Sequence, residues 1–395
     1  MLPDRVALSE TGNLPGAPAA ALLPIGFTRT LLPAYDRQLA AREGRGAPAR
    51  GEMTAGSDRA GYEPLFGYTA VAMRDGQPYV AAMPTDDPRP WQHPDPGYRR
   101  LRRLIRDRLR EGSQTSPKRG KPGADATATQ PLLRHIAHCA LTYECRSAQH
   151  LFYGTGEAAL PSSPTCNAAC IGCISDQPDP DIQPHERLSF LPDLDESVEL
   201  AVEHLERAPN AMISFGQGCE GEPLLNKRNA EIVRRIRART DRGVININTN
   251  GSLPEALRRL IDAGLGSIRV SVFSAREDVF RRYYRPVKYS LEQVRACLAL
   301  ASASGLFTSI NLLTFPGITD DDSEVEALIE LLTDTCTELV QLRNLNIDPE
   351  QLLAAFDGIE FRPIGIRAMA GRLRAAGLAV GSYTHLRRDL AGSHV

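Results

Sequence analysis

The stretch AMISFGQGCEGEPLLNKRNAEIVRRIRARTDRGVININTN, residues 211–250, holds two short apolar runs on either side of an amphipathic segment. The runs Ala211–Phe215 and Val244–Asn248 have the length and composition of buried strands, and the pattern of Lys227–Thr240 is typical of a helix. Because a strand, a helix and a second strand in succession form a crossover unit, this stretch predicts two neighbouring parallel strands.

The same alternation continues on both sides of this stretch. Further helices are predicted over Asp195–Arg207, Pro254–Ala263, Leu291–Ser304 and Ser323–Thr335, and further strands over Ser267–Phe273, Phe307–Thr314 and Leu339–Leu345. In the α/β class, about six such units favour a partial (β/α)6 TIM-like barrel over a closed barrel of eight strands. In either arrangement we expect ligands to bind at the carboxyl ends of the strands.

Composition divides the chain into four expected regions. They are a flexible N-terminal arm (1–55), an N-terminal accessory region (56–150), the core domain (151–350) and a short C-terminal α/β extension (351–395). In the accessory region, two apolar runs within Gly61–Pro84 flank an Asp-Gly turn signal and predict a β-hairpin. The polar segment Gly112–Gln130 is typical of a flexible linker.

The segment Tyr98–Glu111 is predicted to be a basic amphipathic helix, in which Leu101, Leu104, Ile105 and Leu109 share one stripe. An arginine-rich face could bind RNA or an acidic partner. A solvated basic face around an apolar stripe is the commoner arrangement, and we favour it.

The bulk composition excludes several classes of protein. The net charge is only −2, which implies no general attraction to nucleic acid or to a membrane. No apolar run reaches the roughly 20 residues of a membrane helix, and the start of the chain lacks a secretory pattern. We therefore expect a cytoplasmic protein whose eight cysteines are reduced.

The stretch TCNAACIGCIS, residues 165–175, places Cys166, Cys170 and Cys173 within eight residues. Thiolates so close together on one loop can converge on a metal centre. Structural zinc requires four protein ligands, and His150 or His185 could supply the fourth, although neither shows a zinc-finger spacing. An iron–sulfur cube also has four corners, so three thiolates would leave one iron open to a small molecule.

This cysteine pattern, on the loop after the first strand of the expected sheet, resembles the radical S-adenosylmethionine (SAM) superfamily. The resemblance implies that Cys166, Cys170 and Cys173 hold a [4Fe–4S] cluster whose fourth iron binds the amino and carboxylate groups of SAM. It also implies reductive cleavage of SAM to methionine and a 5′-deoxyadenosyl radical, which abstracts a hydrogen atom from a substrate.

A second motif supports the resemblance. Gly221, Glu222 and Pro223 are similar to the family's Gly-Gly-Glu-Pro motif, which binds the SAM amino group, although Glu220 stands in place of the first glycine. The alternative is an ordinary strand-to-helix turn with an acidic residue at its start. We favour the SAM-binding interpretation because the motif and the predicted context agree.

The resemblance implies further contacts to SAM near the ends of later strands. The candidates are Asn248 after the third strand, Ser271 and Ser274 for the ribose, Arg285 for the carboxylate, and Asn311 and Gly317 on the adenine side. Serine at a strand end is also ordinary turn chemistry, and other arginines crowd around Arg285, so a surface role for this side chain competes.

Two groups of polar residues remain. Gln341, Arg343, Asn344 and Asn346, on or after the sixth strand, are candidates for substrate contact, or they satisfy one another inside the barrel. Cys139 and Cys145, with His135, His138 and His150, could form a second metal site, but a role in the core or on a helix face is favoured. Cys219 could lie near the cluster.

The sequence therefore predicts a radical SAM enzyme, with a small molecule, a peptide or RNA as substrate and an electron donor such as flavodoxin or ferredoxin. Whether it acts as an oxidoreductase, a transferase or a lyase is left open. The alternative is a non-catalytic iron–sulfur or zinc protein that serves as a redox sensor or scaffold. The run Gly221–Asn226 resembles the RNA-methylating branch of the superfamily, but no cysteine follows Cys336 to serve as its methyl carrier.

Overall fold

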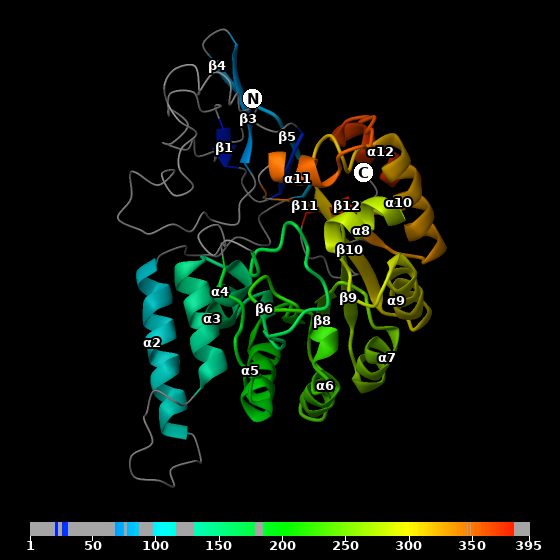
Figure 1. Cartoon of the computed structure of the whole chain (residues 1–395). Helices are drawn as coiled ribbons and strands as arrows, with labels where there is room; N and C mark the ends of the chain where they lie inside the picture. Colours follow the sequence, from blue (N-terminus) through cyan, green and yellow to red (C-terminus); the bar gives the residue numbers. More distant parts are fainter. Residues whose placement is uncertain are drawn as a thin grey trace.

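The computed structural model describes residues 20–22, 26–30, 68–74, 77–86, 98–115, 130–177, 185–345, 347 and 349–382. Its centre is a sheet of seven parallel strands whose order in space follows their order in the chain (Figure 1). They are β6 (Glu157–Ala159), β7 (Met212–Phe215), β8 (Val244–Thr249), β9 (Ser267–Val272), β10 (Phe307–Thr314), β11 (Leu339–Asn344) and β12 (Ala379–Gly381). The predicted α/β partial barrel is thereby confirmed.

Helices follow the strands and cover the outer side of the sheet (Figure 1). They are α5 (Leu194–Arg207), α6 (Asn229–Arg237), α7 (Pro254–Ala263), α9 (Leu291–Ala303), α10 (Asp322–Asp334) and α12 (Ile366–Ala375). Their starts follow from local chemistry. The Asp193 carboxylate accepts from two backbone amides at the start of α5, Ser290 and Gln293 form a capping box on α9, and Asp321 caps α10.

Side chains along the strands alternate between an apolar outer face and a polar inner face. Ile245 and Ile247 of β8 are fully buried in the core between sheet and helices. Asn246, between them, instead donates to the Ser214 hydroxyl at 3.1 Å and accepts from the Ser267 hydroxyl at 2.8 Å. Because successive side chains on a strand point to opposite faces, the interior of the barrel is polar.

Two elements of the core depart from the predicted pattern. Helix α6 begins at Asn229, two residues later than expected, because Pro223–Leu225 forms a short 3-10 turn, η6, ahead of it. Helix α8 (Glu277–Tyr284) was not predicted, since its eight residues stand between β9 and the longer α9. Both differences lie in the connections that follow strands, at the edge of the sheet where ligands are expected.

The N-terminal accessory region contains the predicted hairpin and basic helix. Strands β3 (Tyr68–Arg74) and β4 (Gln77–Val80) pair antiparallel, with the Asp-Gly turn itself outside the described residues. Helix α2 (Tyr98–Thr115) buries Leu101 and Ile105, so the apolar stripe does pack on the protein. Most of the predicted linker also lies outside the described residues.

Helices α3 (Pro131–Thr142) and α4 (Arg146–Tyr153) follow α2 and lie beside the β6 edge of the sheet (Figure 1). Helix α4 leads directly into β6, and α3 packs on both α4 and α5. These two helices were not predicted. They bring Cys139 and Cys145 to the same edge of the barrel as the loop that carries the three clustered cysteines.

Part of the segment predicted as a flexible arm is paired. Strand β1 (Ala20–Leu22) pairs with β3, and β2 (Phe27–Arg29) pairs with β5 (Ala82–Pro84). The Arg29 backbone amide donates to the Asn344 side chain at 3.0 Å, and its buried guanidinium donates to the Leu345 carbonyl oxygen. The rest of residues 1–55 lies outside the described residues. Strand β2 therefore lies against the carboxyl end of β11.

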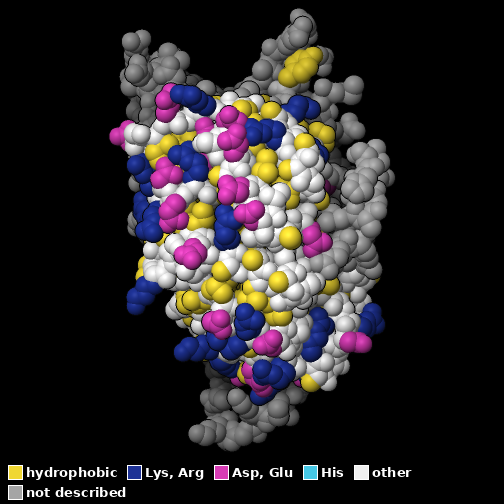
Figure 2. Space-filling model, turned by 90° about the vertical axis from the view of Figure 1, so that its right-hand side faces the viewer, with side chains coloured by type: hydrophobic (Ala, Val, Ile, Leu, Met, Phe, Trp, Pro, Cys, Tyr) yellow, Lys and Arg dark blue, Asp and Glu magenta, His cyan; other side chains and the backbone are white. Residues whose placement is uncertain are grey.

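The surface over α9 and α10 carries charges of both signs. Figure 2 shows basic and acidic side chains interspersed on this side of the molecule. One such pair joins the two helices, Arg295 of α9 with Asp334 of α10 at 2.8 Å. Among the described residues, no helix has both the length and the apolar character that crossing a bilayer requires.

Candidate active site

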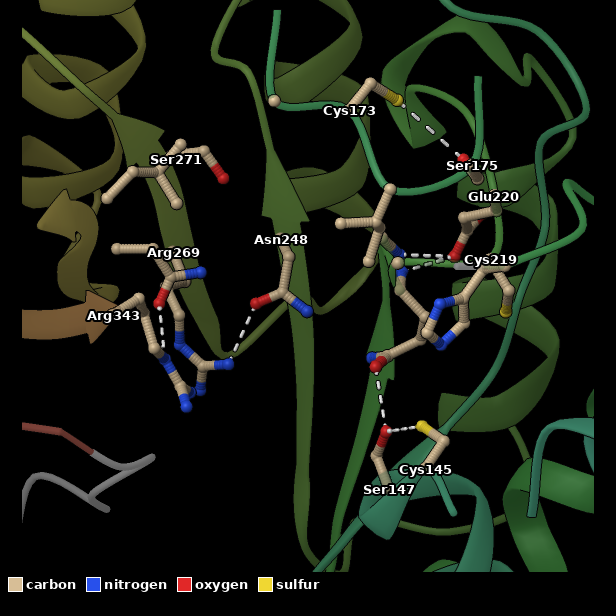
Figure 3. A pocket seen from close by; sticks show the side chains of 18 of the residues that line it. Cys145, Ser147, Cys173, Ser175, Cys219, Glu220, Asn248, Arg269, Ser271 and Arg343 are labelled. Carbon is tan, nitrogen blue, oxygen red and sulfur yellow. Dashed lines mark hydrogen bonds between the residues drawn. The ribbon is translucent and has the colours of Figure 1, made fainter. Parts of the chain in front are cut away.

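A cavity of about 620 Å³ lies at the carboxyl ends of the strands. It is lined by the loop after β6, the turn after β7, the ends of β8 to β11, and parts of α3 and α4 with the turn between them. Figure 3 shows Cys173 and Ser175 at one side and Arg269, Ser271 and Arg343 at another. The position is the one expected for a ligand site in a parallel α/β barrel.

The loop after β6 brings Cys166, Cys170 and Cys173 to this cavity, all three half-buried. Its backbone is held by the segment that ends α8. The Ala169 amide donates to the Tyr284 carbonyl at 3.1 Å, and the Ile171 amide donates to the Tyr283 carbonyl at 3.0 Å. These backbone contacts give the loop a defined shape whether or not a metal is bound.

The turn after β7 holds the other side of the cysteine loop. The Gly221 amide donates to the Ser163 carbonyl at 2.7 Å, and the Glu222 amide donates to the Thr165 carbonyl at 2.8 Å. A Cβ atom on Gly221 would lie 2.1 Å from that Thr165 oxygen, closer than any real contact. Glycine is therefore required at position 221 so that the two backbones can approach.

Glu220, which replaces the first glycine of the family motif, has a structural task that the sequence did not reveal. One carboxylate oxygen accepts from the Gly216 and Gln217 amides at 2.6 and 2.8 Å. The other accepts from the Ser162 and Ser163 amides at 2.7 and 2.9 Å. Burial raises the pKa of Glu220, while these amides favour its charged form. The side chain thus joins the ends of β6 and β7.

Glu222 makes a similar link between β7 and β8. Its carboxylate accepts from the Thr249 hydroxyl at 2.5 Å and from the Asn250 amide at 2.7 Å, and it caps η6 through the Leu224 amide at 2.9 Å. Burial raises the pKa of Glu222 to about 7. Both oxygens are already engaged by the protein, so the first task of this carboxylate is to position the turn.

The cysteines differ in their electrostatic surroundings. Burial raises the pKa of the Cys166 thiol, and burial followed by the neighbouring thiols raises that of Cys170 further. The Arg187 guanidinium lies 3.5 Å from the Cys173 sulfur and pairs with Asp176 at 2.9 Å. A metal would have to displace protons from the first two thiols, because thiolates are the form that binds metals.

Polar side chains from neighbouring strands meet at the floor of the cavity. The Arg269 guanidinium donates to Asn248 at 2.9 Å and to Glu157 at 3.2 Å, and both charged side chains are largely buried (Figure 3). On the next strands Arg343 donates to Asn311 at 3.3 Å. Ser271 and Asn311 occupy partner positions on β9 and β10, so their side chains share the inner face.

The structure separates the predicted site residues into two sets. Those that line the cavity are Cys166, Cys170, Cys173, Gly221, Glu222, Pro223, Asn248, Ser271, Asn311, Arg343 and Asn344. Those that do not are Ser274, Arg285, Gly317 and Gln341. Asn346 lies outside the described residues.

Each of the predicted SAM contacts outside the cavity has a local explanation. The Ser274 hydroxyl donates to Glu324 at 2.7 Å and accepts from the Arg276 amide at 2.9 Å. Arg285 is exposed at the end of α8 in the left-handed backbone region. The Gly317 amide donates to Asp320 at 2.6 Å. The contacts of Ser274 are those of an ordinary turn, the alternative given for this residue in the sequence analysis.

Comparison with known proteins identifies the fold family. A family model described as the radical SAM superfamily matches residues 160–332, the range that includes the cysteine loop and strands β7 to β10. Residues 160–332 belong to the radical SAM superfamily. The family implies a [4Fe–4S] cluster and SAM as cofactors.

Two curated relatives are similar to part of this chain. One is the GTP 3′,8-cyclase of Listeria monocytogenes, 31% identical over 163 residues, covering 40% of this chain and 45% of the relative. The other is the GTP 3′,8-cyclase of Streptomyces coelicolor, 32% identical over 166 residues, covering 40% and 44%. The chain thus spans less than half the length of these relatives.

Solved structures resemble this chain at low identity. Methylornithine synthase is 13% identical with a TM-score of 0.41, covering 71% of this chain and 78% of the other. A radical SAM methyltransferase from Sphaerobacter thermophilus is 18% identical with a TM-score of 0.39, covering 57% and 64%.

The arrangement of the three thiols is compatible with the cluster of a radical SAM protein. Cys166, Cys170 and Cys173 come from one loop and line one cavity. In a cube each of these thiolates would bind a different iron.

The lining residues of this cavity that were not predicted include Glu157, Arg187 and Arg269. A signal existed for Arg269, which is a charged residue inside the apolar strand run SIRVSV. Alternation alone would have placed its side chain inside the barrel. No comparable signal marked Glu157 or Arg187, because what they contact is set by distant parts of the chain.

Proposed function

We propose that this chain is a radical SAM enzyme that holds a [4Fe–4S] cluster on Cys166, Cys170 and Cys173 and acts on a substrate not yet identified. The observation that carries the proposal is the meeting of the three thiols with the Gly221–Glu222 turn at one cavity. When bound, the cluster would supply the electron for reductive cleavage of SAM, the chemistry that leads to abstraction of a hydrogen atom from the substrate. An electron donor such as flavodoxin or ferredoxin would supply the reducing equivalents.

The chain's own residues would position SAM and exclude water. Gly221 and Glu222 hold the cysteine loop through backbone hydrogen bonds, and Pro223 begins η6 beside it. Asn248, Ser271 and Asn311 present polar side chains on the inner face, where SAM would extend from the cluster. We leave Ser274, Arg285 and Gly317 out of the proposed contacts because they do not line the cavity.

Arg343 and Arg269 supply positive charge at the floor of the cavity. Arg343 is held by Asn311 and by Gln341, whose side-chain oxygen accepts at 3.0 Å. Arg269 pairs with Glu157 at 3.2 Å. We propose that these two guanidinium groups orient a substrate that carries a carboxylate or phosphate group.

The relatives named GTP 3′,8-cyclase make GTP one substrate to test. Less than half of each relative is matched, so the part of those proteins outside the match offers no residues for comparison. GTP and a cell extract should each be incubated with the protein as sources of substrate. Mass spectrometry would then detect altered metabolites, peptides and RNA.

The test of the proposed function is anaerobic. The purified chain should be brown, contain close to four iron atoms, and release 5′-deoxyadenosine when SAM and dithionite are added. Cys170→Ala should lose both the iron and the product, whereas Cys297→Ala, which changes a buried thiol on α9, should keep both.

The outcomes separate the two classes of function. A colourless protein that binds zinc at these three cysteines would support the scaffold alternative. A brown protein that leaves SAM intact under all reducing conditions would support a redox sensor. Full iron content in Cys170→Ala would overturn the ligand assignment.

A further inference from the structure

A second group of metal-binding side chains lies at the β6 side of the barrel. His135 and Cys139 stand one turn apart on α3, and Cys219 follows β7. The ligand atoms of these three residues all lie within 4.8 Å of one another. Cys139 and Cys219 are buried, and both line the cavity. None of the three belongs to the proposed cluster ligands.

The spacing of this group fits one ion in tetrahedral coordination. Bonds of about 2.3 Å to sulfur and about 2.0–2.1 Å to nitrogen place a sulfur and a nitrogen on one zinc about 3.6 Å apart. The observed distance from His135 Nε2 to Cys139 Sγ is 3.7 Å. A helix presents residues i and i+4 on one face, so α3 alone can supply this edge of the tetrahedron.

The third ligand is held in place by the turn after β7. The Leu188 amide donates to the Cys219 carbonyl at 2.7 Å. The neighbouring Glu220 carboxylate accepts from the Gly216 and Gln217 amides and so closes the turn. Contacts of this kind fix the Cys219 backbone independently of any metal, which lowers the cost of assembling the site.

Three other nearby side chains, those of His138, His150 and Cys145, have contacts of their own. His138 Nε2 lies 3.1 Å from the Tyr143 hydroxyl, and its Nδ1 lies 3.2 Å from the Thr142 hydroxyl. His150 Nδ1 lies 2.7 Å from the Thr155 carbonyl, which requires a donor at this nitrogen. Cys145 lines the same cavity but contacts the Ser147 hydroxyl at 3.3 Å (Figure 3).

We propose that His135, Cys139 and Cys219 form a second metal site, which binds one divalent ion of the zinc type and leaves its fourth position facing the cavity. Two thiolates balance the charge of the ion, so the site is neutral despite its burial. Nitrogen and thiolate ligands together select zinc over magnesium or calcium. The fourth ligand would be water or a donor atom of a substrate, as at three-ligand zinc sites.

The site can be tested without the proposed cluster. The full chain carrying Cys166→Ala, Cys170→Ala and Cys173→Ala should be prepared anaerobically and titrated with Co²⁺ alone as the probe. We expect one Co²⁺ per chain, the visible absorption of a tetrahedral ion, and a near-ultraviolet thiolate-to-cobalt band that Zn²⁺ abolishes. Because the triple variant lacks the three cluster cysteines, the result does not depend on the proposed function.

Single substitutions in that background identify the ligands. Cys139→Ser and Cys219→Ser should each weaken Co²⁺ binding by more than about 100-fold, since loss of an outer-shell partner alone costs 10–100-fold. Cys297→Ser removes an equally buried thiol outside the group and should leave binding unchanged. His135→Ala changes a half-buried side chain and should weaken binding while retaining the thiolate band.

Three results would overturn the proposal. The first is a lack of Co²⁺ binding, and the second is binding that survives Cys139→Ser and Cys219→Ser. The third is a protein in which Cys139 and Cys219 form a disulfide and which still binds no Co²⁺ after that disulfide is reduced. Far-ultraviolet circular dichroism checks that each variant is folded. If the cysteine variants unfold, unchanged Co²⁺ affinity in folded His135→Ala would still count against the site.

Discussion

The backbone amide of Glu222 donates to the carbonyl oxygen of Thr165 at 2.8 Å and ties the turn after β7 to the start of the cysteine loop. The contact joins the two motifs on which the resemblance to the superfamily rests. It also explains why a glycine precedes Glu222, because any side chain there would meet the same carbonyl. The geometry of the proposed cluster therefore depends on backbone contacts between two strands' ends.

The first prediction concerns this close approach. Gly221→Ala would place a methyl group 2.1 Å from the Thr165 oxygen, so the cysteine loop must move. We expect a loss of about 1–3 kcal/mol in the free energy of unfolding and a lower iron content per chain. Gly371→Ala on α12 meets no atom within 4 Å and should stabilise the helix slightly. Urea unfolding and iron analysis measure both effects, and full iron in Gly221→Ala would refute the argument.

The second prediction concerns Glu220. Glu220→Gln keeps the shape of the side chain but turns a donor group toward backbone amides that need an acceptor. Hydrogen bonds to a charged group contribute about 1.5–3 kcal/mol each, so a loss of at least about 3 kcal/mol is expected. Glu231→Gln, which changes an exposed ion pair on α6, should have almost no effect. Thermal unfolding measures the stability of both variants. Equal midpoint temperatures for Glu220→Gln and Glu231→Gln would disprove the role of Glu220 in joining the strand ends.

A third prediction concerns the reduction potential of the proposed cluster. The Arg187 guanidinium lies 3.5 Å from the Cys173 sulfur, where a positive charge stabilises the reduced state. Arg187→Gln should retain the iron and shift the potential to more negative values, which a redox titration followed by electron paramagnetic resonance would show. Arg285→Gln, outside the cavity, serves as the control. An unchanged potential in Arg187→Gln would remove this residue from the site.

The fourth prediction is a pH dependence of stability away from the cavity. Burial raises the pKa of Glu324 from 4.5 to about 7, so the folded state binds this proton more tightly than the unfolded state. The free energy of unfolding should therefore fall as the pH rises from 4.5 to 7. At about 1.4 kcal/mol per pKa unit, the loss is at most about 3.5 kcal/mol.

Glu324→Gln tests this pH dependence because it removes the titration and keeps an acceptor for the Ser274 hydroxyl. The variant should match the parent chain near pH 5 and exceed it in stability at pH 8. Glu326→Gln changes an exposed residue of the same helix and should follow the parent chain at both values. Equal pH profiles for Glu324→Gln and the parent would contradict the prediction.

Much of the barrel could be predicted because its signals are local. Pro254–Ala263 and Phe307–Thr314 have the predicted bounds, since a proline begins the first and an uninterrupted strand pattern marks the second. Helix α8 was missed, and the bounds of strands β6 and β12 were not predicted, because short elements carry few periods of the pattern. The spacing of the three cysteines was equally local, and the structure brings all three to one cavity.

The contacts of other site residues could not be predicted in this way. The alternation of side chains along β9 predicts that Ser271 points inward. It does not apply to Ser274, which lies beyond the end of the strand and contacts Glu324 on α10. Glu220 was seen only as a departure from a motif, although its carboxylate joins two strand ends.

The sequence by itself determined the α/β alternation and the loop of three closely spaced thiols, because periodicity and ligand spacing are properties of a short stretch of chain. Only the tertiary structure decided that Cys219 lies beside Cys139 and His135, and that the Glu220 carboxylate meets Ser162. Those contacts join residues far apart in the chain, and they exist only once the parallel strands are aligned and the helices before β6 pack against them.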